Sequence, residues 1–358
     1  MNLKLKNIEF LRVFLISIII IMHTTAYGSW SLLKNFSEIP ELKFFHNIFI
    51  QANNTVEGFF IIAGFLFIYT FKNQTIKQFI IKKYARLSPT ILFAILICAI
   101  VSLWHAIKFR FWDDILVILL LNNFGFCFAH GSTPALWFTS ALFSGLLAYF
   151  LITKIESKKI KIILFSLLPL IAYGILEYLQ KGSFSAPHKN YYIFNVGFLR
   201  AIGGIGTGCI IGYVYKLFNN IIFPKLYKIF INFFEIGLII FIVWWLTFPH
   251  KQYNCLIFVF AFAILLWLFS LKQGIISKIT DKNLWVKLGK YQYSLYVIHS
   301  VIGKILLNVL WVNNSDFVKN HPYSTISFVI IAIIIAGIFT YHFVEKPCTK
   351  ILKNTFKI

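Results

Sequence analysis

Charged residues are scarce in this chain. They make up 13% of its 358 residues, against about 25% in an average soluble domain, while hydrophobic residues reach 59%. The few charged residues are mostly basic, because the chain has 34 Lys and Arg but only 12 Asp and Glu. The basic residues lie between apolar runs and form no single patch, which argues against nucleic acid as a partner. The composition predicts an all-α protein that crosses a membrane several times.

Cysteine is sparse and follows no pattern. The five cysteines are scattered, mostly inside apolar runs, and form no CxxC pair, so we expect neither a disulfide framework nor a redox motif. HxxxH and Cys/His pairs are absent too, and we therefore expect no metal site. No small-x-small cleavage site follows the first apolar run, which contains Arg12 and His23, and this favours a retained helix over a signal peptide.

Long apolar segments recur ten times and predict a bundle of about ten transmembrane helices. They lie at about 8–27, 47–71, 87–107, 134–153, 160–178, 193–215, 229–248, 253–271, 289–310 and 325–344. The connections between them are short, so we expect a single transmembrane domain over residues 1–358 and no appended extracytoplasmic hydrolase-like domain.

The segment 115–129 decides the topology. It is short for a span and contains Asn122, Asn123 and Gly125. If it does not cross and the N-terminus is cytoplasmic, 23 Lys and Arg lie on the cytoplasmic side and 8 outside; if it crosses, the numbers become 11 and 20. The positive-inside rule therefore favours ten spans with both termini in the cytoplasm.

The first span carries two polar residues on one face. Arg12 and His23 are eleven residues apart, close to three full helical turns, and about 16 Å apart along the axis. Ionisable groups inside a membrane tend to face a partner or a water-filled cavity. Glu57, in the second span, is a candidate to hold the His23 imidazole in the tautomer that a general base needs. The alternatives for Glu57 are an ion pair with Arg200 or a solvated interfacial carboxylate.

A basic cluster precedes the third span. Lys83 and Arg86 lie at the expected start of that helix, where convergent cations and a helix N-terminus make a good phosphate site. The alternative is a topology signal or a contact with anionic membrane lipids.

The span 193–215 combines one charge with regularly spaced glycines. Arg200 indicates a polar cavity, or alternatively an ion pair with Glu177 or Glu235. The spacing of the glycines is typical of close helix packing and not of a nucleotide loop. They are Gly204, Gly208 and Gly212.

Six motifs, in order along almost the whole chain, resemble those of the membrane-bound acyltransferase family 3. They are Arg12-x10-His23, Glu57-Gly-Phe-Phe-Ile-Ile-Ala-Gly-Phe, Lys83-x-x-Arg86-Leu-Ser-Pro, Leu136-Trp137-Phe138-Thr139-Ser140, Tyr293-Ser294-Leu295-Tyr296-x-x-His299 and Glu345-Lys346-Pro347. The resemblance implies a bacterial inner-membrane enzyme that transfers an acyl group, usually acetyl from cytoplasmic acetyl-CoA. The implied acceptor is a sugar hydroxyl of a cell-envelope glycan or of a lipid-linked saccharide.

The resemblance also assigns roles to residues. It makes His23 catalytic, and we keep Glu57 as its expected partner from the positions of the two residues in their spans. It associates Arg12, Lys83 and Arg86 with acyl-CoA, and we take Trp137, Arg200 and His299 as candidates for binding the acceptor. The chain departs from the family at three points. Lys83 stands where Arg is commoner, Ala63 stands where Ser is commoner, and the carboxylate that follows the Trp-x-x-Ser segment in many members is missing here. Lysine cannot form the bidentate phosphate contact of arginine.

A transporter or flippase of an envelope precursor is the alternative function. Buried Arg, His and Glu side chains also mark substrate paths in transporters. Common transporter folds, however, contain internal repeats, and the second half of this chain has no second copy of the Arg-x10-His segment.

Overall fold

The structure is a computed structural model in which helices account for nearly all regular elements. It describes residues 5–25, 51–103, 109–123, 131–182, 184, 189–191, 194–247 and 255–356. Two-residue strands β1 (Asn190–Tyr191) and β2 (Phe194–Asn195) form one small antiparallel hairpin. The predicted all-α class is confirmed.

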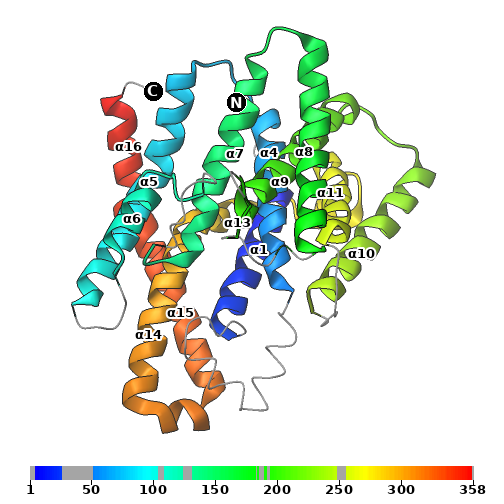
Figure 1. Ribbon diagram of the computed structural model, residues 1–358. Helices are drawn as coiled ribbons and strands as arrows, with labels where there is room; N and C mark the ends of the chain where they lie inside the picture. Colours follow the sequence, from blue (N-terminus) through cyan, green and yellow to red (C-terminus); the bar gives the residue numbers. More distant parts are fainter. Residues whose placement is uncertain are drawn as a thin grey trace.

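Figure 1 shows the helices as one elongated bundle. In chain order they are α1 (Lys6–Thr25), η2 (Ala52–Asn54), α4 (Thr55–Tyr69), α5 (Ile76–Ser102), α6 (Phe111–Ile118), η3 (Pro134–Leu136), α7 (Trp137–Thr153), α8 (Lys158–Gln180), α9 (Val196–Phe218), α10 (Lys225–Thr247), α11 (Cys255–Leu271), α12 (Ile275–Ile279), α13 (Asn283–Gly289), α14 (Gln292–Asn320), α15 (Pro322–Thr340), the π-helical turn η4 (Tyr341–Glu345) and α16 (Lys346–Thr355).

Seven helices in the described parts of the chain are long and apolar enough to cross a membrane. They are α1, α4 with η2, α5, α8, α9, α10, and α15 with its continuation through η4 and α16. Of the other three predicted spans, α7 and α11 are apolar but have 17 residues each, and α14 has 29 residues with more polar positions. The chain is therefore a multi-pass membrane protein, while the count of ten stays a prediction.

The short helix α6 bears on the topology. It has 8 residues, so it is about 12 Å long and cannot cross a hydrocarbon core of about 30 Å. Turns follow it at Leu119 and at Asn122–Asn123, and Leu120 has a φ of 58°. The described part of the segment 115–129 therefore agrees with the non-crossing interpretation, whereas residues 124–130 lie outside the described part.

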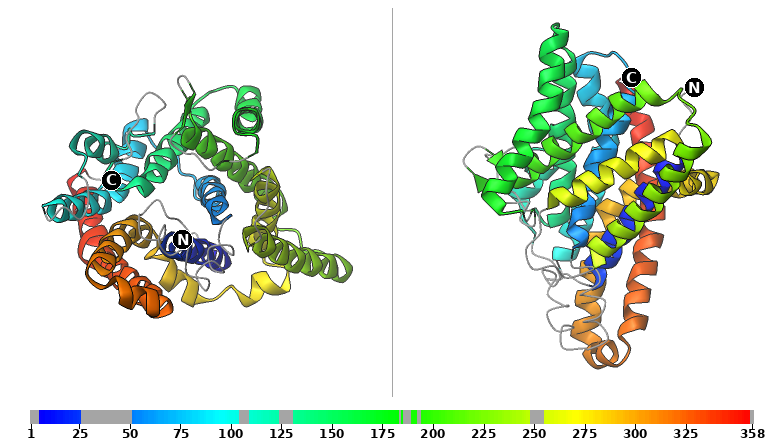
Figure 2. Two further views of the ribbon diagram at one scale, coloured as in Figure 1. Left: turned by 60° about the horizontal axis from the view of Figure 1, so that its bottom comes forward. Right: turned by 90° about the vertical axis from the view of Figure 1, so that its right-hand side faces the viewer.

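Helices α1 and α4 occupy the middle of the bundle. Figure 2 (left) shows the other long helices arranged around them, and α1 contacts α4, α11, α13 and α14. The closest pair is α4 and α9, where glycines replace side chains. A Cβ atom on Gly208 would lie 1.9 Å from the carbonyl oxygen of Ile61, and one on Gly64 would lie 1.9 Å from that of Ile205. The predicted role of the α9 glycines in close helix packing is confirmed.

Candidate functional site

A cavity of about 580 Å³ lies where α1 begins, α4 ends, and α5 and α14 begin. Ligand pockets usually fall between about 300 and 1,000 Å³. Its polar wall carries several cations and one described acid, Glu9. These cations are Arg12, Lys72, Lys82, Lys83 and Arg86. The structure thus brings Arg12, Lys83 and Arg86 to one cavity, as their expected common role requires.

The rest of the cavity wall is apolar. Residues of α4 and α7 face each other across it, and Tyr296 of α14 joins them. They include Ile62, Ala63 and Leu66 from α4, and Phe138, Leu142 and Leu146 from α7. A ligand with an anionic head and an apolar arm would match both parts of this wall.

The helix α5 begins earlier than its sequence predicts. Thr75 and Gln78 form a reciprocal capping box at its start, so Arg86 lies ten residues past the first helical position, Ile76. The positive end of a helix dipole acts within about one turn. The expectation that Arg86 binds phosphate at a helix N-terminus is therefore wrong, although its place on the cavity wall keeps it available to an anion.

The cations of the cavity differ in their partners. Arg12 donates to both carboxylate oxygens of Glu9, at 3.1 and 3.0 Å, and its side chain is 20% exposed. Arg86 is exposed and forms no hydrogen bond or ion pair with a described residue. Glu345 lies within electrostatic reach of Arg12 and is held by Ser294, whose Oγ donates to it at 2.6 Å. Sequence analysis missed Glu9, although its position three residues before Arg12 is a typical helix ion-pair spacing.

Two histidines from opposite ends of the chain meet beyond the cavity. The Nδ1 atom of His23 lies 2.9 Å from Nε2 of His299, and the ring centroids are 4.9 Å apart. On its other side, His299 Nδ1 is hydrogen-bonded to the backbone carbonyl of Tyr296. The Tyr296 ring lines the cavity and lies 5.6 Å from the His299 ring. One aromatic ring therefore lies between the cavity and the histidine pair.

Glu57 does not contact His23. Its carboxylate is fully buried and accepts from Arg200 Nε at 2.5 Å and from the Tyr173 hydroxyl at 2.9 Å. Arg200 also donates to the carbonyl groups of Phe184 and Asn53. The expectation that Glu57 orients His23 is therefore wrong, and the alternative of an ion pair with Arg200 is confirmed. The close approach of α4 and α9 explains the pairing, because it brings these two side chains face to face.

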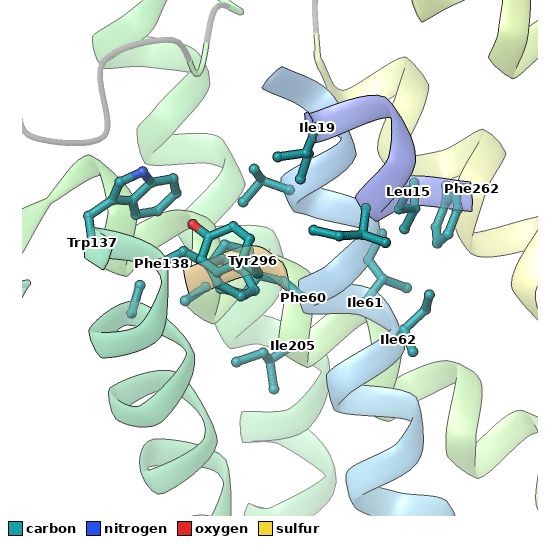
Figure 3. Packing of buried hydrophobic residues seen from close by; sticks show 14 of the residues in the cluster. Leu15, Ile19, Phe60, Ile61, Ile62, Trp137, Phe138, Ile205, Phe262 and Tyr296 are labelled. Carbon is teal, nitrogen blue, oxygen red and sulfur yellow. The ribbon is translucent and has the colours of Figure 1, made fainter. Parts of the chain in front are cut away.

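Trp137 connects the ion pair to a layer of aromatic rings. The Arg200 guanidinium carbon lies 5.2 Å from the Trp137 ring centroid, in cation–π geometry. Phe60, Phe138 and Tyr296 follow in ring-to-ring contact, with centroid distances of 4.7 and 5.0 Å, and Figure 3 shows them gathered between α4 and α7. We call Phe60, Trp137, Phe138 and Tyr296 the aromatic layer.

The predicted site residues thus fall into three groups around the aromatic layer, to which Trp137 itself belongs. Arg12, Lys83 and Arg86 lie on the cavity; the other residues form the histidine pair and the Glu57–Arg200–Trp137 cluster. In the described parts of the chain, no three His, Cys, Asp or Glu side chains gather into a group that could hold a metal ion.

The fold and the site define a multi-pass helical membrane protein with a basic, amphipathic cavity beside a buried histidine pair. A sequence model described as an acyltransferase domain matches residues 5–342. The chain therefore belongs to the membrane-bound acyltransferase family 3 and is a membrane acyltransferase. No curated protein and no solved structure is similar enough to count as a match.

Proposed function

We propose that this enzyme transfers an acyl group, most simply acetyl, from cytoplasmic acyl-CoA to a sugar hydroxyl of a cell-envelope glycan or of a lipid-linked saccharide. One observation carries the proposal: a single cavity joins a basic wall to an apolar one and ends one ring away from a histidine pair. Acyl-CoA has the matching form, with phosphates at one end and an acyl thioester at the end of a long arm.

The basic wall supplies the contacts for the nucleotide end. Arg12 and Arg86 are suited to bidentate contacts with phosphate, and Lys83 adds a point charge. The nucleotide would enter from the cytoplasm, because the cavity opens among those ends of α1, α4, α5 and α14 that the positive-inside rule predicts to be cytoplasmic.

The apolar wall leads the arm toward the histidines. Arg12 and His23 are about 16 Å apart along α1, a span suited to the pantetheine arm. The acyl end would meet Tyr296 first, beside His299. The acceptor would approach from the side of the aromatic layer away from the cavity, where Arg200 lies against the Trp137 ring. We propose that the enzyme lies in the bacterial inner membrane.

The imidazole of His23 supplies the base. The acceptor O–H bond breaks as its proton passes to His23, the acceptor oxygen bonds to the acyl carbonyl carbon, and the carbon–sulfur bond breaks. The departing thiolate then takes the proton from the His23 imidazolium and leaves as the free thiol of CoA. Formation of an acyl-imidazole on His23, followed by transfer to the acceptor, uses the same lone pair.

The test replaces His23 by glutamine, which keeps a polar side chain but removes the base. Positioned acid–base catalysis contributes about 10² to 10⁴ in rate, so His23→Gln should lower acyl transfer from acetyl-CoA at least about 100-fold. The measurement is mass spectrometry of surface glycans from a deletion strain that expresses each variant. The matched control is Ser17→Ala, an exposed position on the same helix whose hydroxyl bonds only to the Val13 carbonyl. Acylation at the wild-type level in His23→Gln would contradict the proposed mechanism.

A further inference from the structure

The direction of the hydrogen bonds in the histidine pair is fixed by the contact of His299 with the backbone. The atom that His299 presents to Tyr296 is Nδ1, and its partner is a backbone carbonyl oxygen. A carbonyl oxygen can only accept, so Nδ1 of His299 must carry the hydrogen. The backbone of α14 thereby determines the tautomer of His299.

The tautomer of His299 in turn determines which nitrogen of His23 carries the hydrogen. A neutral imidazole has one N–H, so with Nδ1 protonated the Nε2 of His299 is an acceptor. That Nε2 lies 2.9 Å from Nδ1 of His23, which must then be the donor. A neutral His23 therefore carries its lone pair on Nε2.

We propose that His299 is a positioning residue that holds His23 in the tautomer with a basic Nε2. The inference rests on the proposed function, because it assigns the lone pair that His23 uses there. His299 touches neither donor nor acceptor in this assignment and acts through His23. It replaces both the expected role of Glu57 as orienting residue and the expected role of His299 in binding the acceptor.

The arrangement also suits the charge that develops in the reaction. When the acceptor proton moves to Nε2, His23 becomes an imidazolium, and its Nδ1–H still points to His299 Nε2. A hydrogen bond from a charged donor is about twice as strong as a neutral one, so this contact strengthens as the reaction proceeds. No proton leaves His299, because its own hydrogen stays bonded to Nδ1, which donates it to the Tyr296 carbonyl.

A purely structural role is the alternative for a buried histidine. His299 is 1% exposed and packs against Tyr296, so a substitution could act by disturbing the core. The two roles differ in what a replacement must retain. Positioning requires a hydrogen-bond acceptor at the place of Nε2, whereas packing requires only volume.

The experiment compares His299→Gln with His299→Met, which have similar length and flexibility. The glutamine oxygen can accept from His23 Nδ1, and methionine offers only a weak sulfur acceptor. We expect His299→Met to lower kcat at least about tenfold, yet by less than the roughly 10⁴-fold that an enforced wrong tautomer costs in a serine protease. The KM for acetyl-CoA should stay within about twofold, because the cavity is untouched. His299→Gln should recover most of the lost kcat.

Two further variants keep the test decisive. His299→Asn retains polarity, but its shorter side chain cannot place an acceptor at the Nε2 position, so it should behave like His299→Met; it replaces that variant if the methionine protein does not fold. Thermal unfolding of every variant in detergent separates folding from kcat. Equal kcat for His299→Gln and the variants without the acceptor, or wild-type kcat in His299→Met, would overturn the inference. Activity in His23→Gln, measured in parallel, would instead overturn the proposed function.

Discussion

Arg86 is an exposed cation of the cavity wall. It has no hydrogen-bonding partner among the described residues, and the buried Glu345 within its electrostatic reach keeps the hydrogen bond from Ser294 when Arg86 is removed. A hydrogen bond to a charged group contributes about 1.5 to 3 kcal/mol, and each 1.4 kcal/mol is about tenfold in affinity. We therefore expect Arg86→Ala to weaken acetyl-CoA binding by at least about tenfold without a change in thermal stability.

The measurement is titration calorimetry of acetyl-CoA with the purified protein in detergent. Lys159→Ala is the matched control, because Lys159 is an exposed cation in the first turn of α8 and does not line the cavity. Affinity in Arg86→Ala equal to that of the control would remove Arg86 from the donor site.

Local relations among the site residues were predictable, and distant ones were not. The shared face of Arg12 and His23 follows from helical periodicity, and Glu9 was accessible by the same rule. The contact between His23 and His299 joins residues 276 positions apart, and no periodicity reports such a contact. Glu57 was matched with the wrong partner because depth along the membrane does not fix which neighbouring helix a side chain faces.

At the scale of the elements, the pair α4 and α9 is held by both its glycines and its charges. The Glu57–Arg200 ion pair is 0% and 2% exposed, and removal of one member of such a pair costs about 3 to 5 kcal/mol because the other is left uncompensated. We expect Glu57→Gln to lower thermal stability by about that amount. The double variant Glu57→Gln, Arg200→Met should recover part of this loss. It leaves no unpaired charge, although the carbonyl groups of Phe184 and Asn53 lose their donor.

Thermal unfolding in detergent gives the comparison, with Glu156→Gln as the control for loss of an exposed carboxylate. An unfolding midpoint of Glu57→Gln equal to that of the control would show that the ion pair does not stabilise the α4–α9 contact.

Helix existence was easier to predict than helix boundaries. Each of the ten apolar segments overlaps a helix, but α5 begins in water, at its Thr75–Gln78 capping box, before the hydrocarbon run starts. An apolar segment marks where the chain enters the hydrocarbon core and not where its helix begins. The predicted start of α5 was therefore too late in the sequence. The π-helical turn η4, which ends at Glu345, has no counterpart in sequence periodicity.

For the whole molecule, the charge distribution makes a topology prediction. The connection between α7 and α8 should lie in the cytoplasm, and the turn between α14 and α15 outside. In a cysteine-free background, Lys159→Cys should resist an impermeant thiol reagent applied to intact cells, and Asn320→Cys should react. Both positions are exposed. Labelling at position 159 would reverse the orientation.

The aromatic layer bears on whether ions can leak through the bundle along the membrane potential. The described cavity reaches Phe138 and Tyr296, while His23 and His299 lie beyond its wall. A membrane potential does work of about 2.3 kcal/mol on each elementary charge for every 100 mV. A continuous aqueous path through the bundle would therefore let ions cross and dissipate the potential. In the proposed reaction only the acyl end of the donor would pass the rings of Phe138 and Tyr296, so the cavity itself need not extend to the histidine pair as a water-filled path for protons and ions.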